Sequence, residues 1–188
     1  MLYTKAGDEG KTTLYHCNQK LSKSSKVIEA LGALDEVNSF LGVIKIKVIQ
    51  GETLKRKKGL SLDYHRILHQ IQENLFIIQA EVAGAEKRLP ASKVNQAEKI
   101  IASIEKEIPP IKTFTISGAT EISALLDFAR TLARRAERRV IAVAEEEEVV
   151  KISRQTLSYL NRLSSLLFAL SRQSAYKSGI EEGKPSYK

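Results

Sequence analysis

The chain has no tryptophan and a single cysteine, Cys17, among its 188 residues. One thiol cannot form a disulfide within the chain or build a zinc site from thiolates, so a hydrophobic core must stabilise the fold. No apolar run approaches the roughly 20 residues that span a membrane, and the first residues lack the apolar stretch of a signal peptide. We therefore expect a cytoplasmic protein, without membrane contact, that forms one domain over residues 1–188.

Long segments of alternating apolar and polar residues are also missing, which argues against a fold built on a β-sheet. Pro109 and Pro110 stop one helical segment, and an extended piece, residues 111–118, follows them. We predict an all-α five-helix bundle of the ferritin-like up-down type, with an irregular N-terminal segment over about residues 1–20 and a loose tail over about 179–188. Apolar residues at helical spacing predict helices over about 26–48, 62–84, 92–107, 120–146 and 151–176, the third with Ser92 as its N-cap.

The net charge of +8 suits an anionic partner such as nucleic acid, a membrane surface or a polyphosphate. Charge alone does not choose among these partners. Aromatic residues do not alternate with basic ones, so the stacking platform of a single-strand binder is missing. Much of the excess charge lies in residues 55–58, Lys-Arg-Lys-Lys, a run that is typical of a solvated loop.

The N-terminal segment from Thr4 to Thr13 concentrates glycine, threonine and lysine. Glycines let backbone N–H groups approach phosphate oxygens closely, so such a segment can bind a triphosphate. The spacing does not match the Walker A motif, because the first glycine of that motif would fall on Lys5. From these residues alone, a phosphate-binding segment and a flexible N-terminal lead-in both remain open.

Three polar residues share one face of the fourth predicted helix. Arg130, Arg134 and Glu137 follow one another at helical spacing at the rim of the core, where they could bind a ligand or form local ion pairs. Asp35 lies at the edge of the apolar stripe of the first helix, and Arg130 is a candidate partner for its carboxylate. Asn161, at the edge of the apolar face of the fifth helix, is either an amide that contacts a nucleotide or a surface residue.

The histidines offer little chemistry. His65 and His69 share a face of the second predicted helix, but the glutamate and third ligand of a zinc-protease site are missing. No motif for Ser/His/Asp catalysis is present either. We therefore predict no metal ion bound by side chains alone.

Four motifs stand in an order that is typical of one enzyme family. They are Tyr-Thr-Lys-Ala-Gly-Asp-Glu-Gly-Lys-Thr-Thr from residue 3, Glu-Ala-Leu-Gly-Ala-Leu-Asp-Glu-Val-Asn-Ser from residue 29, Phe-Ala-Arg-Thr-Leu-Ala-Arg-Arg-Ala-Glu-Arg-Arg-Val from residue 128, and Tyr-Leu-Asn-Arg-Leu-Ser-Ser-Leu-Leu-Phe from residue 159. From about Tyr3 to Arg172 the chain resembles the PduO-type ATP:cob(I)alamin adenosyltransferases. Four motifs in this order are much more specific than any one of them.

The resemblance implies a homotrimer that transfers the 5′-deoxyadenosyl group of ATP to cob(I)alamin, with each active site between two subunits. Asp35 and Arg130 would form a salt bridge between subunits on the corrinoid side. Phe114 would help to displace the lower axial ligand and give a four-coordinate cobalt(II) that is easier to reduce. Cobalt(I) would attack C5′ and expel triphosphate, with a reductase and a cobalamin-dependent acceptor enzyme as further partners. ATP would carry Mg²⁺ and bind to Thr4, Gly7, Asp8, Gly10, Lys11, Thr12, Lys23, Arg134, Glu137 and Asn161.

The chain departs from the family pattern at two places. Ile116-Ser117-Gly118-Ala119 stands where Pro-Gly-Gly is common, and Ser165 stands where an aspartate is common. The first departure changes the lip of the corrinoid site, and the second removes a polar group near Asn161. Two other functions stay open: a cobalamin carrier on the same bundle, against which retention of the arginines, Glu137 and Asn161 argues, and a basic helical nucleic-acid-binding protein.

Overall fold

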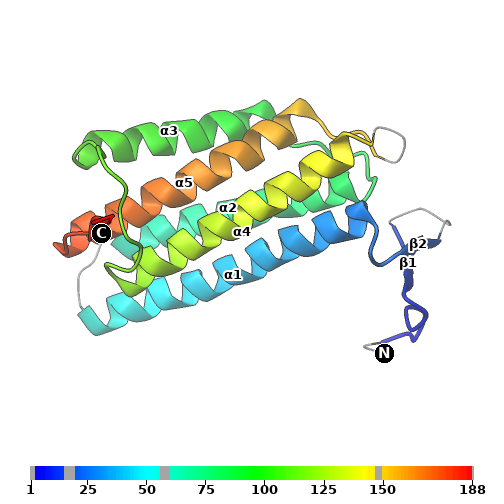
Figure 1. Cartoon of the computed structure of the whole chain (residues 1–188), viewed down its shortest axis with the longest axis horizontal. Coiled ribbons are helices and arrows are strands. Elements are labelled where there is room, and N and C mark those ends of the chain that lie inside the picture. Colours follow the sequence, from blue (N-terminus) through cyan, green and yellow to red (C-terminus); the bar gives the residue numbers. More distant parts are fainter. Residues whose placement is uncertain (1–2, 15–19, 56–59, 147–149, 188) are drawn as a thin grey trace.

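The computed structural model describes residues 3–14, 20–55, 60–146 and 150–187, with the backbone alone over 51–55 and 60–63. Successive helices run in opposite directions (Figure 1), so the predicted all-α, up-down bundle of five helices is confirmed. Within the described residues, none of these helices is long and apolar enough to cross a membrane. The helices are α1 (Lys26–Lys55), α2 (Leu60–Val82), α3 (Ala91–Glu107), α4 (Glu121–Ala144) and α5 (Arg154–Ser178).

Helix α4 packs between α1 and α5, while α2 packs on α1 and α3 packs on α5. The middle of the buried face of α4 carries small residues at helical spacing, Ala129, Ala133 and Ala136, which are fully buried. Small side chains let the neighbouring helices approach closely. The facing stripe of α1 supplies large residues such as Leu34 and Leu41, and burial of each leucine contributes roughly 1.5–3 kcal/mol. The apolar faces predicted from helical spacing are therefore the core of the bundle.

Polar residues fix where the helices begin. The Thr120 side chain accepts a hydrogen bond from the backbone N–H of Ser123 and caps α4, and the Ser123 hydroxyl accepts one from the N–H of Thr120 in return. At the start of α5, the fully buried carboxylate of Glu81 accepts hydrogen bonds from Ser153 and Thr156. Helix α3 is an exception, because its N-cap is Pro90, without a side-chain hydrogen bond, and the predicted cap at residue 92 is wrong.

Two short strands in the N-terminal segment were not predicted. Strands β1 (Lys11–Thr13) and β2 (Lys20–Ser22) pair antiparallel, with Thr12 opposite Leu21. Three residues are too few to display a period of two, so the sequence pattern could not reveal them. Figure 1 shows this hairpin beyond the end of the bundle, beside the start of α1.

Two segments differ from the expected boundaries. Helix α1 continues through Gly51 to Lys55, past its predicted end at residue 48, because one glycine costs a helix only about 1 kcal/mol. Residues 56–58 of the predicted basic loop lie outside the described residues. The tail over residues 180–187 has no helix or strand, yet "loose" does not describe it. The carbonyl of Gly183 accepts a hydrogen bond from the N–H of Ile116 at 2.7 Å, and Glu182 forms an ion pair.

Candidate functional site

The hairpin gathers the N-terminal residues that were predicted to bind phosphate. The backbone N–H of Lys23 donates to the carbonyl of Gly10 at 2.9 Å. Lys23 Nζ lies against Gly7, where an added Cβ would be only 2.8 Å from it. Gly10 has a φ of +72°, a left-handed conformation that favours glycine. Gly7 and Gly10 therefore both lie against Lys23, which is distant from them in the sequence.

The other N-terminal residues that were predicted to bind phosphate lie in the adjacent turn and on β1. A turn is closed by the N–H of Asp8, which donates to the carbonyl of Lys5 at 3.2 Å, and Thr12 and Lys11 lie on β1. Most of these side chains are exposed, which leaves the ammonium and hydroxyl groups available to an anion. We call the described residues 4–14 and 20–23 the hairpin segment.

The exposed face of α4 carries an arginine that has no ion pair among the described residues. Arg135 pairs with Glu36 of α1, and Arg139 Nη2 lies 3.7 Å from a carboxylate oxygen of Glu29. Both therefore point toward α1. Arg134 is exposed and forms no ion pair with any residue that the structure describes, so its guanidinium can accept an anionic ligand. Glu137, one turn later, is half-buried.

Asn161 lies exposed on α5, the neighbour of α4. Its Oδ1 accepts a hydrogen bond from Arg162 Nη1 at 3.1 Å, while Arg162 Nε also pairs with Glu98 of α3 at 2.9 Å. The amide nitrogen is then left to donate to a ligand. No hydrogen bond or ion pair within the described residues links Asn161 to Arg134 or Glu137.

A cavity of about 530 Å³ lies at the other end of the bundle, between α4, α5 and the loop before α4. It brings together Arg130 and Phe114, two of the residues predicted for the corrinoid side. Phe114 is 80% exposed, and an exposed aromatic ring at the edge of a cavity is available to an apolar ligand surface. The lining consists of Ile111, Lys112, Thr113, Phe114, Thr115, Ser117, Asp127, Arg130, Phe168 and Arg172.

A buried charge cluster in the wall of this cavity was missed by sequence reasoning. Asp127 and Arg172 are 4% and 3% exposed and form an ion pair. Arg172 Nη1 also lies 2.7 Å from Glu182 Oε1, and Arg130 Nε lies 3.6 Å from Asp127 Oδ1. Burial raises the pKa of the Glu182 carboxyl, which Arg172 opposes and Asp127 reinforces. Asp127 and Arg172 interrupt apolar stripes of their helices, a signal that each requires a buried partner.

Within the described residues, Arg130 does not pair with its predicted partner Asp35. Asp35 is exposed on α1 and forms no ion pair with another described residue. The ion pair of Arg130 is instead with Asp127, one turn earlier on the same helix. The Nε of Arg130 is buried and has no hydrogen-bond partner among the described residues. A contact between Asp35 and Arg130 would have to join two chains.

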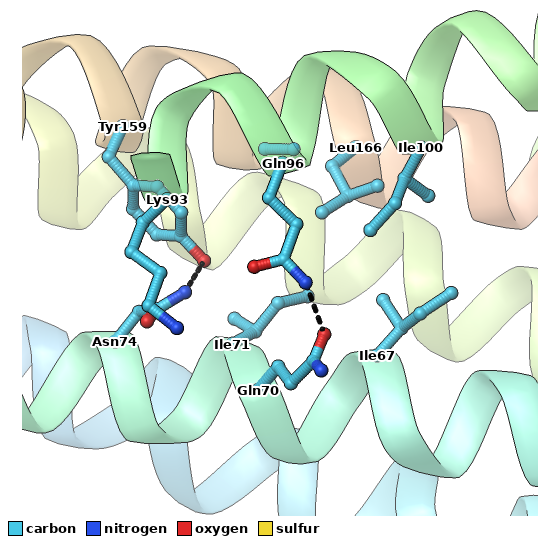
Figure 2. Close-up of a pocket in the computed structure, with 10 residues that line it drawn as sticks. Ile67, Gln70, Ile71, Asn74, Lys93, Gln96, Ile100, Tyr159 and Leu166 are labelled. Atoms are coloured by element: carbon cyan, nitrogen blue, oxygen red, sulfur yellow. Dashed lines mark hydrogen bonds between the residues drawn. The ribbon is translucent and has the colours of Figure 1, made fainter. Parts of the chain in front are cut away.

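A second cavity, between α2, α3 and α5, is too small for a substrate. Its volume is about 10 Å³, enough for one water molecule. Figure 2 shows two hydrogen bonds between polar side chains around it: Asn74 donates to the Tyr159 hydroxyl at 3.0 Å, and Gln96 donates to Gln70 at 3.0 Å. Burial raises the pKa of the Tyr159 phenol to about 12. These residues hold the helices together.

The described residues contain no group of three or more His, Cys, Asp or Glu side chains that could hold a metal ion. They do contain the hairpin segment, which suits an anion, at one end of the bundle. The cavity, which suits an apolar surface, lies at the other end. Helix α4 runs from the cavity end toward the hairpin end over 24 residues, about 36 Å at 1.5 Å per residue. A single chain therefore leaves the hairpin segment and the cavity apart (Figure 1).

Comparison with known proteins adds three findings. The family model for cobalamin adenosyltransferase matches residues 2–174. A corrinoid adenosyltransferase of Bacillus subtilis is 37% identical over 183 residues, which cover 95% of this chain and 89% of that protein. The corrinoid adenosyltransferase PduO of Citrobacter freundii is 33% identical over 178 residues, which cover 91% of this chain but 49% of that protein.

The fold is likewise similar to solved structures. A variant of the PduO-type ATP:corrinoid adenosyltransferase from Lactobacillus reuteri, in complex with cobalamin and ATP, superposes with a TM-score of 0.86 at 26% identity. The match covers 99% of this chain and 97% of that one.

Proposed function

The chain belongs to the cobalamin adenosyltransferase family, and we propose that it transfers the 5′-deoxyadenosyl group of ATP to the cobalt of cob(I)alamin. The products are adenosylcobalamin and triphosphate. Relatives named as corrinoid adenosyltransferases, and a similar structure that holds cobalamin and ATP, support this reaction.

One observation carries the proposal: helix α4 contributes both to the cavity and to an exposed face that holds an arginine. Arg130 lines the cavity, while Arg134, one turn further along the helix, is exposed and unpaired within the described residues. A ligand pair with one apolar macrocycle and one polyanion would need these two surfaces next to each other. We assign the corrinoid to the cavity, with Phe114 and Arg130, and ATP to the face that continues from it.

The ATP-binding residues follow from this assignment. Arg134 neutralises charge on the triphosphate, and Glu137 and Asn161 contact the nucleotide. The hairpin segment wraps the phosphates through glycine N–H groups and lysines. Its residues in this role are Thr4, Gly7, Asp8, Gly10, Lys11, Thr12 and Lys23. Mg²⁺ enters with ATP, because this ion is typically bound through phosphate oxygens and water with only one or two carboxylates.

The reaction itself requires positioning more than proton transfer. Cobalt(I) supplies an electron pair to C5′, the cobalt–carbon bond forms, and the carbon–oxygen bond breaks with its electrons leaving on triphosphate. No side chain has to act as a base. The protein holds the two substrates in line and neutralises charge on the leaving group. Phe114 occupies the lower face of the corrinoid, where it displaces the axial ligand before reduction.

We further propose that the chain acts as a homotrimer whose active sites lie between subunits. The hairpin segment of one subunit would cover the α4 face of its neighbour, which brings together the groups that one chain keeps apart. Asp35 would then pair with Arg130 of that neighbour. Helix α1 carries an exposed apolar row that suits a contact between subunits: Val43, Ile46 and Ile49, which are 45%, 58% and 48% exposed.

The cellular setting is proposed from the same resemblance. The protein acts in the cytoplasm as one domain, with a reductase that supplies cobalt(I) and an acceptor enzyme that uses the product. The replacement of Pro-Gly-Gly by Ile116-Ser117-Gly118-Ala119 reshapes the lip of the cavity, and Ser165 alters contacts near Asn161. The departure at Ser165 changes affinity rather than the type of reaction.

The test is incubation of the purified protein with Mg·ATP and chemically reduced cob(I)alamin, followed by the cobalamin spectrum. We expect conversion to adenosylcobalamin by the native chain and conversion about 100-fold slower or more by Arg134→Ala. Binding of both substrates without conversion would favour a cobalamin carrier. Binding of neither, together with salt-sensitive binding of nucleic acid, would overturn the proposal.

A further inference from the structure

The buried arginine of the cavity wall contacts four parts of the chain at once. Arg172 of α5 pairs with Asp127 of α4 and with Glu182 of the tail, and it donates a hydrogen bond to Thr115 Oγ1 in the loop before α4. Its guanidinium carbon also lies 5.0 Å from the ring centroid of Phe168. A guanidinium that is 3% exposed is costly to bury, so each of these contacts compensates its lost hydration.

The first consequence concerns Arg130. One carboxylate oxygen of Asp127 faces Arg172, and the other lies 3.6 Å from Arg130 Nε. Arg172 therefore holds the carboxylate of Asp127 from one side, and this carboxylate attracts Arg130 on the other side. The side chain of Arg130 is 31% exposed and its Nε lacks a hydrogen-bond partner among the described residues, so the carboxylate of Asp127 is its charged partner within the part of the chain that the structure describes.

The second consequence concerns the loop that carries Phe114. Residues 111–119 form no helix or strand, so few backbone hydrogen bonds hold them. The hydrogen bond from Arg172 to Thr115 ties down the residue next to Phe114. The N–H of Ile116 donates to the carbonyl of Gly183, whose neighbour Glu182 pairs with Arg172. The loop and the C-terminal end of the chain meet at the same end of the bundle (Figure 1).

We propose that Arg172 is a positioning residue for the corrinoid side of the site, which fixes Arg130 through Asp127 and the Phe114 loop through Thr115. Arg172 does not itself need to touch a substrate. The contacts of Arg172 with Asp127 and Thr115 set the separation between Arg130 and the ring of Phe114. Both of these groups line the cavity. This inference rests on the proposed function, because the two groups it positions are those assigned to the corrinoid.

The kinetic test uses substitutions that preserve shape. Thr115→Val removes the hydroxyl that Arg172 binds, Thr115→Ser keeps it, and Asp127→Asn removes the charge that attracts Arg130. We expect Thr115→Val to raise the KM for cobalamin about tenfold, the effect of losing one hydrogen bond to a charged group. Asp127→Asn should raise it by a similar factor because the charge that attracts Arg130 is lost, and the KM for ATP should change less than about twofold in both variants. Thr115→Ser should retain the native KM for cobalamin. Thermal unfolding of each variant identifies any general loss of structure.

A second readout does not depend on activity. Hydrogen exchange of the Ile116 N–H, which donates to Gly183, should be about tenfold faster in Thr115→Val than in the native chain. It should be unchanged in Thr115→Ser, and exchange in helix α3 should be unchanged in both variants. Unchanged loop exchange with a native KM for cobalamin would overturn the proposal, and so would equal increases in the KM for both substrates. A native chain that makes no adenosylcobalamin contradicts the proposed function, whereas the exchange result still decides whether Arg172 holds the loop.

Discussion

The hairpin segment and the cavity wall are held in place by different forces. In the hairpin segment, exposed lysines and glycines are arranged by backbone turns and a short pair of strands outside the core. In the cavity wall, Asp127 and Arg172 are almost fully buried and depend on each other. A substitution in the exposed segment should therefore change ligand binding without unfolding the protein, whereas one in the buried pair should change both.

The largest expected effect is on stability at the cavity wall. Arg172→Met fills a similar volume but leaves Asp127 buried without its partner, and breaking a buried pair from one side costs about 3–5 kcal/mol. Denaturant unfolding should show this loss. Arg135→Met is the matched control, because its ion pair with Glu36 is exposed and contributes at most about 1 kcal/mol. Similar losses in the two variants would remove the contrast between buried and exposed charge.

The next effect is on catalysis with stability preserved. Arg134→Ala should lower kcat/KM for ATP by about 100-fold or more, because a group that stabilises transition-state charge contributes about 3 kcal/mol. Its free energy of unfolding should stay within about 0.5 kcal/mol of the native value, since Arg134 is exposed. Arg138→Ala, also exposed on α4 but without an assigned role, should keep native kinetics. An equal loss in both variants would indicate a general effect of charge.

A smaller effect is expected from the backbone of the hairpin segment. Gly10 has a φ of +72°, and alanine there costs about 1 kcal/mol. Because this cost disfavours the folded turn and not the bundle, Gly10→Ala should raise the KM for ATP about fivefold and leave the KM for cobalamin unchanged. Gly32→Ala within α1 meets no neighbouring atom and should not alter either constant. A native KM for ATP in Gly10→Ala would remove the hairpin segment from the site.

The smallest effect is a pH dependence at the tail. The pKa of Glu182 is raised, chiefly by burial, so the folded protein holds this proton more tightly than the unfolded chain does. The resulting gain in the free energy of unfolding is complete below the pKa of Glu182 in the unfolded chain, near 4.5. It is lost as the pH rises through the higher pKa of this carboxyl in the folded protein. The neutral variant Glu182→Gln should match the native protein in acid and exceed it slightly in stability at neutral pH. Parallel stability curves for the two proteins would contradict this.

The repeating pattern of apolar residues predicted the helices and the face that holds Arg130, Arg134 and Glu137, because a helix repeats every 3.6 residues over many turns. Very short elements, and contacts between residues distant in the sequence, could not be predicted in this way. The strand Lys11–Thr13 is too short to have a period, and the hydrogen bond of Ile116 links it to a residue far along the chain.

The buried ion pair of Asp127 and Arg172 could have been predicted in part from the sequence. Asp127 and Arg172 are separated by 45 positions, so no local spacing relates them. Each one interrupts an apolar stripe, however, and a buried charge requires a partner. Their identities as charged residues in the core were readable from the sequence, while their pairing needed the packing of α4 against α5.

The most direct test of a site shared between subunits mixes two variant chains, each of which we expect to be inactive alone. We propose that each site takes its hairpin segment from one subunit and its cavity from the next, so co-expression of Lys23→Ala with Arg130→Ala should restore adenosylcobalamin formation. Random trimers from equal amounts would be mixed in about three-quarters of cases, with one intact site of three, which predicts about a quarter of the native activity. No recovery from verified mixed oligomers would mean that each chain builds its own site, and would contradict the account.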